Sequence, residues 1–377
     1  MMISPIAYLE FFRTENVNFF SGVPDSLLKE FCACVGEELY ESQHIISVNE
    51  GGAIALAIGN HLATGDVPLV YIQNSGLGNC VNPLLSLASP EIYAIPMVLM
   101  IGWRGEPNEP DEPQHVHQGR VMLSMLESMD VPYVVLDQQA DIAFEQTTKL
   151  LNKARTQNRP VAIVVRKNTF SKYSKAKIKD ANVLNREEVI GFIADSLPND
   201  ACVICTTGMP SRELFEFRKS RAESHSSDFL TVGGMGHASH IALGIAAAKS
   251  RRAVYCIDGD GAALMHLGAL AINGQARLEN FHHIVLNNGA HGSVGGQPTV
   301  AKKIDLCGIA EACGYKLTGR VSNRETLRSA INSTINQSGP SFFDVRVGVD
   351  SRSNLGRPST TPEENKLAFI ENLRGCN

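Results

Sequence analysis

Short apolar runs alternate along the chain with longer segments in which apolar residues recur every three or four positions. The first pattern is typical of buried strands and the second of amphipathic helices, and their alternation predicts βαβ units with parallel sheets. In the first half the predicted strands are Phe19–Ser21, Ile45–Ser47, Val67–Ile72, Met97–Ile101, Tyr133–Leu136 and Val161–Val165. The predicted helices of that half are Pro5–Glu15, Ser26–Val35, Glu50–Thr64 and Asp141–Thr156.

The second half repeats this alternation. Its predicted strands are Ala201–Cys205, Ala253–Ile257, His283–Asn287, Lys316–Thr318 and Ser341–Arg346. Its predicted helices are Arg186–Leu197, Ser239–Lys249, Leu264–Arg277, Lys303–Cys313 and Arg324–Gln337. Residues 171–186 between the halves are rich in lysine and serine, which is typical of a surface linker. We therefore predict an α/β protein with two doubly wound parallel-sheet domains, residues 1–170 and 187–377.

Composition and charge narrow the class of protein. The chain has 377 residues, of which 44% are hydrophobic, so each half can bury a core. The net charge is −5 and no basic stripe occurs, which argues against a nucleic-acid partner. The longest apolar stretch, Ile92–Trp103, is too short to span a bilayer. Glu10, Arg13 and Glu15 interrupt the apolar pattern of the first residues, so we expect no signal peptide, no membrane partner and a cytoplasmic protein.

The cysteines give no sign of a disulfide framework. There are nine of them at irregular spacings, so we interpret them as reduced thiols. Cys202 and Cys205 form a C-x-x-C pair, but it lies within a strand-like apolar run. A redox or zinc role for this pair is therefore disfavoured.

Two polar segments follow successive predicted strands in the second half. Asp258-Gly259-Asp260-Gly261 follows one strand, and Asn287-Asn288-Gly289 follows the next. Parallel sheets bind ligands at the carboxyl ends of their strands, and glycines let backbone N–H groups approach an anion. Carboxylate and amide oxygens, together with diphosphate oxygens and water, suit Mg²⁺. Either segment alone is also typical of an ordinary turn, but the pair favours a site for a diphosphate and a metal ion.

The GDG segment followed at this distance by NN resembles the motif of the thiamine-diphosphate-dependent 2-oxo acid decarboxylases. The resemblance implies that Asp260, Asn288 and the backbone carbonyl of Ala290 bind Mg²⁺. It implies that Gly259, Gly261 and Ala262 contact thiamine diphosphate. It also implies the thiamine-diphosphate-binding fold for both domains, without the central third domain that full-sized members carry.

A glutamate at a helix start in the first half matches a second element of that family. Glu50 follows a predicted strand and opens a helix rich in alanine and glycine. The resemblance implies that Glu50 hydrogen-bonds the aminopyrimidine ring of the cofactor and so activates it. The alternative is a carboxylate that only complements the helix dipole, which stabilises a helix by about 0.3–1 kcal/mol.

Other segments of the second half match further parts of the cofactor site. In Gly233-Gly234-Met235-Gly236, the resemblance puts Met235 under the bent cofactor and the Gly233 carbonyl at its amino group. Met235 could otherwise simply fill a gap in the core. Thr207 and Gly208, after a predicted strand, would line the diphosphate end.

Candidate proton carriers lie in the first half. Asp25, in GVPDS, and the pair His115 and His117 look like the acid–base positions of the family, and such side chains can transfer protons near neutral pH. Asp25 could equally cap the helix predicted from Ser26. The two histidines could instead lie on a surface loop or form a weak metal site. We interpret His282 and His283, which lie around the start of a predicted strand, as structural.

Three segments narrow the resemblance to the phosphonopyruvate decarboxylases, which form phosphonoacetaldehyde and CO₂ in phosphonate biosynthesis. They are GVPDSLL at 22–28, NEGGAIALAIG at 49–59 and NNGAHGSVGGQPT at 287–299. Sulfopyruvate decarboxylases share much of this pattern and remain the alternative. Ser293 and Arg104 are the candidates for contacting the anionic headgroup of the small 2-oxo acid substrate.

Other enzyme classes fit less well. A pyruvate-decarboxylating or acetolactate-forming enzyme is disfavoured by the missing central domain. A nicotinamide oxidoreductase would need G-x-G-x-x-G, and Gly76-Leu77-Gly78-Asn79 lacks the third glycine. A non-catalytic subunit that binds thiamine diphosphate is disfavoured because Glu50, Asp260 and Asn288 are all present. Since Glu50 and Asp260 lie in different halves, the resemblance implies a homo-oligomer with active sites between subunits.

Overall fold

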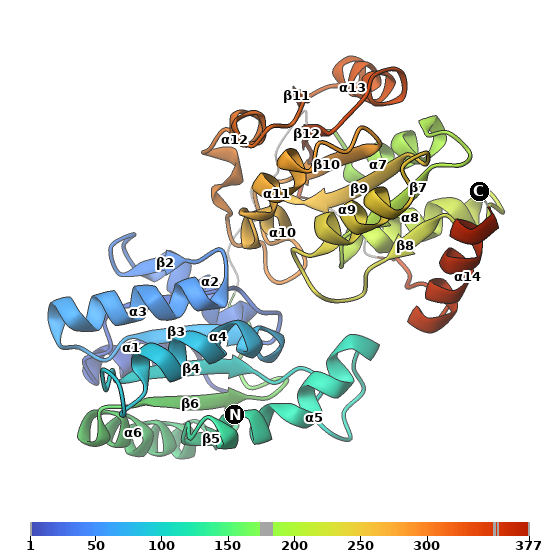
Figure 1. Cartoon of the computed structure of the whole chain (residues 1–377). Helices are drawn as coiled ribbons and strands as arrows, with labels where there is room; N and C mark the ends of the chain where they lie inside the picture. The colour runs from blue at the N-terminus through green and yellow to red at the C-terminus, as the bar shows by residue number, and fades with distance from the viewer. Residues whose placement is uncertain (1, 174–183, 350–351, 353, 376–377) are drawn as a thin grey trace. The chain divides into compact units, whose positions relative to one another are not determined.

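The computed structural model describes residues 2–173, 184–349, 352 and 354–375 (Figure 1). It forms two compact units, Met1–Lys177 with Val294–Gln297, and Ile178–Ser293 with Pro298–Asn377. Each unit contains a six-stranded sheet in which every strand pairing is parallel. The α/β class with two parallel-sheet domains is thereby confirmed. Most of the predicted linker lies outside the described residues, so the linker and the domain bounds stay predictions.

The sheet of the first unit has the strand order β2-β1-β3-β4-β6-β5. Its strands are β1 (Phe20–Gly22), β2 (His44–Ile46), β3 (Leu69–Gln73), β4 (Met97–Gly102), β5 (Tyr133–Val135) and β6 (Pro160–Val165). Its helices are α1 (Pro5–Thr14), α2 (Lys29–Glu38), α3 (Glu50–Thr64), α4 (Leu77–Pro83), α5 (Pro113–Ser128) and α6 (Ala140–Gln157). A 3-10 turn at Asn74–Gly76 and a π-helical segment at Leu84–Ala88 flank α4.

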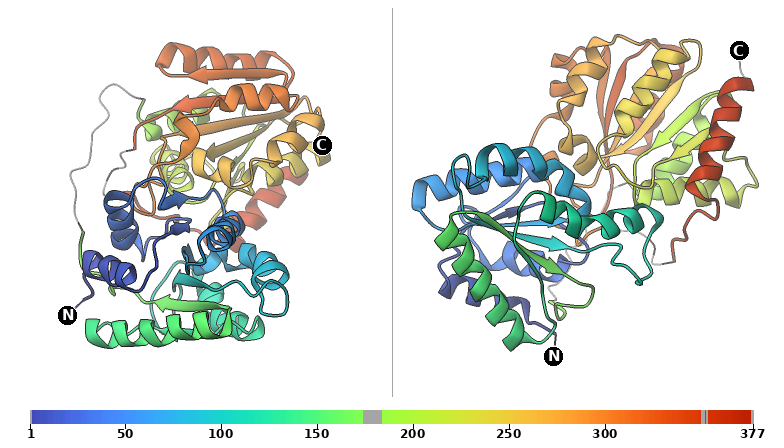
Figure 2. Two further views of the ribbon diagram at one scale, coloured as in Figure 1. Left: turned by 90° about the vertical axis from the view of Figure 1, so that its left-hand side faces the viewer. Right: turned by 60° about the horizontal axis from the view of Figure 1, so that its bottom comes forward.

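Helices cover both faces of this sheet (Figure 2). Successive residues of β3, β4 and β6 contribute to opposite cores, because side chains alternate across a strand. One core packs α1, α2 and α6 against the sheet, and the other packs α3, α4 and α5 against it. Burial on both faces explains why these strands appear in the sequence as continuous apolar runs.

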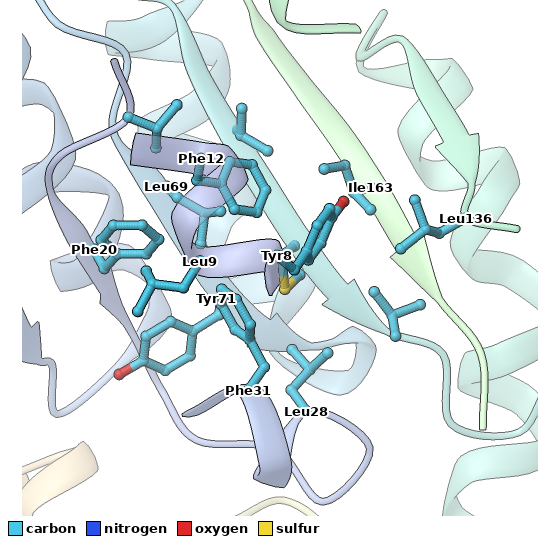
Figure 3. Packing of buried hydrophobic residues seen from close by; sticks show 14 of the residues in the cluster. Tyr8, Leu9, Phe12, Phe20, Leu28, Phe31, Leu69, Tyr71, Leu136 and Ile163 are labelled. Atoms are coloured by element: carbon cyan, nitrogen blue, oxygen red, sulfur yellow. The ribbon is translucent and has the colours of Figure 1, made fainter. Parts of the chain in front are cut away.

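Aromatic side chains dominate the core on the α1 side. Tyr8 is fully buried, with its ring centroid 4.7 Å from that of Phe12 and 6.1 Å from that of Phe31 (Figure 3). Its hydroxyl lies 2.6 Å from the hydroxyl of Thr147, so the polar end of the ring has a partner inside the core. Helices α1, α2 and α6 are thereby fastened to one face of the sheet.

The second unit has the strand order β11-β12-β10-β9-β7-β8. Its strands are β7 (Cys202–Cys205), β8 (Asp228–Leu230), β9 (Val254–Gly259), β10 (Phe281–Asn287), β11 (Leu317–Val321) and β12 (Ser341–Arg346). Its helices are α7 (Arg186–Ser196), α8 (Met209–Ser220), α9 (Ala238–Ala248), α10 (Asp260–Met265), α11 (Ala269–Gln275), α12 (Leu306–Ala312), α13 (Arg324–Asn336) and α14 (Pro362–Gly375). One core packs α7, α8 and α13 against the sheet, and the other packs α9 to α12 and α14.

Several elements differ from the sequence-based prediction. Helix α5 begins at Pro113, which is favourable at the first helical position, so His115 and His117 lie on a helix rather than in a loop. Helix α2 begins at Lys29 rather than Ser26, because a turn occupies the intervening residues. The structure also contains β8, α8 and α14, which the sequence pattern did not predict. The cysteines in the described part of the chain are free, and none of its helices has the length and apolar run needed to cross a membrane.

A buried ion pair joins two helices of the second unit. Arg186 of α7 donates from Nε and Nη2 to Glu213 of α8, over 2.8 and 2.6 Å. The two residues are 5% and 2% exposed, so each charge is compensated by the other inside the unit.

Replacing Arg186 by Met should lower the free energy of unfolding by about 3–5 kcal/mol, because Glu213 would stay buried without a cation. The double variant Arg186→Met/Glu213→Leu should regain most of that loss. Urea unfolding followed by circular dichroism measures both. A single variant as stable as the wild type would contradict this assignment.

Candidate active site

Glu50 is a buried carboxylate at the first position of α3. Asn49 caps the helix, with its side chain accepting from the Gly52 N–H over 2.8 Å. This cap fixes the helix start directly after β2 and so fixes where Glu50 lies. Glu50 is 5% exposed, and its Oε2 accepts from Asn79 Nδ2 over 2.7 Å. Burial raises the pKa of Glu50, and the Asn79 hydrogen bond offsets part of that effect.

The other carboxylate oxygen of Glu50 lies against the backbone of Gly76. A Cβ atom on residue 76 would lie 2.1 Å from Glu50 Oε1, so only glycine leaves room for the carboxylate. Gly76 and Asn79 both belong to the Gly76-Leu77-Gly78-Asn79 segment, which follows β3. Sequence reasoning considered this segment only as part of a dinucleotide motif, and its actual contact is with Glu50.

Asp25 is a second buried carboxylate, after β1. It is fully buried, and its Oδ1 accepts from Gln73 Nε2 over 2.7 Å, while Oδ2 accepts from the Leu27 N–H over 2.9 Å. Burial raises its pKa, and these hydrogen bonds offset part of the rise. Gly102, at the end of β4, leaves the space for Oδ2, since a Cβ there would lie 2.1 Å away. The bond to Leu27 is cap-like, so the capping alternative describes part of what Asp25 does.

Arg104 lies two residues beyond β4 and is held by several polar groups. Its Nε donates to Asp111 Oδ2 over 2.8 Å, its Nη2 also bonds that carboxylate, and its Nη1 donates to Ser26 Oγ over 2.8 Å. A cavity of about 180 Å³ borders Ser26, Arg104, Asp111 and Lys167. Arg104 therefore adjoins a cavity of mixed polar and apolar lining that also borders Ser26, the residue after Asp25, and the charge of Arg104 is largely matched by Asp111.

The two histidines of α5 have different surroundings. His115 is half-buried, and burial, together with the charge of Arg104, lowers its pKa to about 4. Its Nδ1 is buried and has no hydrogen-bond partner among the described residues. His117 is exposed, and its Nδ1 accepts from Arg120 over 2.7 Å. The structure thus associates His115 with Arg104 and leaves His117 on the surface of the unit.

In the second unit the two predicted metal segments meet. Asp260 is the first residue of α10 and is 3% exposed. Its carboxylate accepts from the hydroxyl of Thr299 and from the backbone N–H groups of Gly261 and Asn288. Burial raises the pKa of Asp260 to about 6, and these neutral donors offset only part of the rise. A desolvated carboxylate held by neutral donors is suited to a cation.

The segment after β10 supplies further oxygen atoms. Asn288 is 8% exposed, and its Oδ1 accepts from the Ala290 N–H over 2.9 Å, which turns the chain sharply. The Ala290 carbonyl accepts from the Gly292 N–H over 2.9 Å and retains a second lone pair. Ser293 is exposed beyond this turn. Carboxylate, amide and carbonyl oxygens form a donor set of the kind that Mg²⁺ prefers.

The Gly233–Gly236 loop packs on the GDG segment. The Cε atom of Met235 and the ring of His291 both lie 3.3 Å from the place of a Cβ on Gly261. The Ala262 carbonyl lies 3.0 Å from the equivalent place on Gly236. Sequence reasoning missed His291, although it stands three residues after Asn288.

Thr207 and Gly208 follow β7, whose neighbour in the sheet is β9. Gly208 is the N-cap of α8, and Thr206 lies against Gly259, with its Cγ2 4.0 Å from the place of a Cβ there. Of the predicted residues, the second unit thus brings together Asp260, Gly261, Asn288 and Met235. Thr207 and Gly208 follow β7, which lies beside β9, the strand that leads to Asp260.

Comparison with known proteins agrees with this geometry. Residues 7–128 match the N-terminal TPP-binding domain of thiamine pyrophosphate enzymes, and residues 206–345 match the C-terminal TPP-binding domain. A phosphonopyruvate decarboxylase of Streptomyces viridochromogenes is 32% identical over 351 residues, 86% of this chain and 83% of the relative. The chain belongs to the phosphonopyruvate decarboxylase family. The resemblance inferred from the sequence motifs is confirmed.

Two other relatives extend the comparison. A phosphonopyruvate decarboxylase of Streptomyces hygroscopicus is 32% identical over 93% of this chain and 89% of its own length. A sulfopyruvate decarboxylase of Methanosarcina acetivorans is 27% identical over 97% of this chain and 96% of its own length. The relatives are thus named for two different substrates, phosphonopyruvate and sulfopyruvate. This chain is a thiamine pyrophosphate enzyme of the decarboxylase type.

Replacing Gly76 by Ala should lower decarboxylase turnover about 100-fold, because the added Cβ would displace the Glu50 carboxylate by an ångström or more. The matched control is Gly78→Ala, since a Cβ there meets nothing within 4 Å. Steady-state CO₂ release measures turnover, and circular dichroism checks the fold. Equal activity of the two variants would show that Gly76 does not set the position of Glu50.

Proposed function

We propose that this protein decarboxylates 3-phosphonopyruvate to phosphonoacetaldehyde and CO₂, with thiamine diphosphate and Mg²⁺ as cofactors. The observation that carries the proposal is the similarity to two phosphonopyruvate decarboxylases over most of both chains, with Glu50, Asp260 and Asn288 all present. Decarboxylation of sulfopyruvate is the second candidate, because a sulfopyruvate decarboxylase matches 97% of the chain at lower identity.

The proposed magnesium ligands are Asp260, Asn288 and the Ala290 carbonyl. Their support is the fit of the donors: Asp260 is buried, is held by neutral hydrogen-bond donors and has a raised pKa, so its ionised form gains from a cation. The ion would complete the charge balance of the Asp260 carboxylate.

When bound, thiamine diphosphate supplies the electron sink that takes up the bonding pair as CO₂ leaves. In the proposal, Glu50 accepts a hydrogen bond from the aminopyrimidine ring, since its carboxylate is buried beside the neutral Asn79 amide. Met235 and the Gly233 carbonyl support the ring system. The diphosphate is contacted by backbone groups of Thr207, Gly208, Gly259, Gly261 and Ala262.

Asp25, His115 and His117 are the proposed proton carriers. Asp25 has a raised pKa and a carboxylate fixed by hydrogen bonds, so it can carry a proton at Oδ1 or Oδ2 and transfer it to a reacting group. His115 is neutral near pH 7, because its pKa is lowered to about 4, and its buried Nδ1 has no hydrogen-bond partner among the described residues. His117 is the weakest of the three, since it is exposed and bonded to Arg120.

Arg104 and Ser293 are the proposed contacts to the phosphonate. Arg104 adjoins the cavity of about 180 Å³, and Ser293 is exposed. Because Asp111 already pairs with Arg104, a bound phosphonate would interact with a guanidinium group whose charge is partly neutralised.

The proposal also includes a cytoplasmic homo-oligomer with active sites between subunits. The support for the oligomer is the resemblance to thiamine-diphosphate-dependent decarboxylases, whose active sites lie between subunits.

The test of the substrate is a comparison of three 2-oxo acids with the cofactor-loaded protein. We expect CO₂ release and aldehyde formation from phosphonopyruvate, with kcat/KM at least about 100-fold above that for sulfopyruvate or pyruvate. Removal of Mg²⁺ by EDTA should abolish the activity, and added Mg²⁺ should restore it. Preferential turnover of sulfopyruvate would replace the first candidate by the second.

The test of the Glu50 role is the Glu50→Gln variant. Loss of the carboxylate charge and basicity should lower kcat about 100-fold or more while thiamine diphosphate still binds, because the amide oxygen is a weaker acceptor and the amide cannot take up a proton from the ring. Isothermal titration calorimetry measures binding, and stopped assays measure kcat. The surface variant Glu145→Gln serves as the control, and full activity of Glu50→Gln would remove Glu50 from the chemistry.

A further inference from the structure

Three polar side chains on strands β9 and β10, which lead to the GDG and NN segments, share one face of the second sheet. Strands β9 and β10 run parallel, with His283 opposite Cys256 and Val285 opposite Asp258. The side chains of Cys256, Asp258 and His283 therefore lie on the same face, and their polar atoms all lie within 4.8 Å of one another. Each of the three residues is at most 1% exposed.

Hydrogen bonds connect this cluster to the chain segment that carries Asp260. Asp258 Oδ1 accepts from the Gly259 N–H over 2.9 Å, and Asp258 Oδ2 lies 3.3 Å from His283 Nε2. On its other side, His283 Nδ1 lies 3.4 Å from the Tyr315 hydroxyl. A carboxylate only accepts, so the bond to an ionised Asp258 requires a proton on Nε2, and in that neutral tautomer Nδ1 is the acceptor for the Tyr315 hydroxyl. The chain of contacts thus runs from Tyr315 to Gly259, the residue before Asp260.

Burying the polar side chains of Asp258 and His283 in the core of the sheet costs desolvation free energy. Neighbouring positions of the same two strands hold Val254, Ile257, Ile284 and Val285, which need no partner. A buried carboxylate and imidazole stabilise a fold less than apolar residues of similar volume, and their usual gain is a defined geometry. The cluster precedes Asp260 in the chain, and the orientation of the Asp260 carboxylate determines whether it can bind the metal ion.

We propose that Asp258 and His283 are positioning residues that fix the Gly259 N–H and thereby aim the Asp260 carboxylate at the metal. This inference rests on the proposed function, which makes Asp260 a magnesium ligand. The three residues could alternatively be ligands of a separate metal ion. Asp258 Oδ2 and His283 Nε2 lie 3.3 Å apart, and Asp258 Oδ1 already accepts from the Gly259 N–H, so the polar atoms that a separate ion would need are engaged with protein groups.

The experiment measures Mg²⁺ affinity in the presence of saturating thiamine diphosphate, by calorimetry on the full chain without substrate. His283→Gln should raise the apparent Kd for Mg²⁺ at least tenfold, and Tyr315→Phe, which removes only a hydroxyl, should raise it two- to fivefold. At saturating Mg²⁺ the kcat of Tyr315→Phe should return to the wild-type value.

His282→Gln is the matched control. His282 neighbours His283 on β10, is 3% exposed, and points to the opposite face, where it bonds Ser341 over 2.9 Å. It should lower the melting temperature without changing the Kd for Mg²⁺. If His283→Gln and Tyr315→Phe also leave that Kd unchanged, the cluster is merely structural and the proposal is wrong.

Two other outcomes separate this inference from its rivals. A stoichiometric zinc ion that resists EDTA, and that Cys256→Ser releases, would identify the cluster as a metal site and overturn the positioning role. Failure of the wild-type protein to bind Mg²⁺ with thiamine diphosphate would instead overturn the proposed function. The two failures are therefore distinguishable.

Discussion

The burial of carboxylates without a cation is the constraint on which the rest of the candidate site depends. Glu213 and Asp228 are buried too, but Arg186 and Arg218 pair with them, so their role is to join elements. Within the described part of the chain, the hydrogen-bond partners of Glu50 and Asp260 are neutral donors, the Asn79 amide in one case and a hydroxyl with backbone N–H groups in the other. Burial raises their pKa values, and the neutral donors offset only part of that rise. The fold thus carries an uncompensated desolvation free energy at these two carboxylates, which a bound cofactor and its metal ion would reduce.

The same constraint explains why small residues surround the carboxylates. Gly76 lies against Glu50, and Gly102 lies against Asp25, each where a Cβ would overlap a carboxylate oxygen. Both glycines lie at or just beyond the carboxyl end of a strand, the part of an α/β sheet where ligands bind. Close backbone contact removes water from the carboxylate without supplying a charge, and this combination raises a carboxyl pKa.

Much of the fold and part of the site could be predicted from the sequence, for physical reasons that particular elements illustrate. Strands β3, β4, β9 and β10 are buried on both faces, so they stand out as apolar runs. The motifs at the ends of β9 and β10 located Asp260 and Asn288, and the motif after β2 located Glu50. Helix α5 was missed because Pro113 and the acidic residues before it are typical of a loop, although proline suits a first helical position. Strand β8 has three residues and begins with Asp228, so no apolar run marks it. The contact of Asn79 with Glu50 depends on how α4 packs on α3, which no local pattern encodes.

His282 and His283 show how tertiary register separates residues that look equivalent in the sequence. Both are buried on β10, and sequence reasoning treated them alike. Because side chains alternate across a strand, one faces Tyr255 and Ser341 in the core of α7, α8 and α13, and the other faces Asp258. The register between β9 and β10 then decides that His283, and not His282, connects to the residue before Asp260. A shift of one residue would exchange their surroundings, so the geometry of the Asp260 segment is tied to the pairing of two central strands.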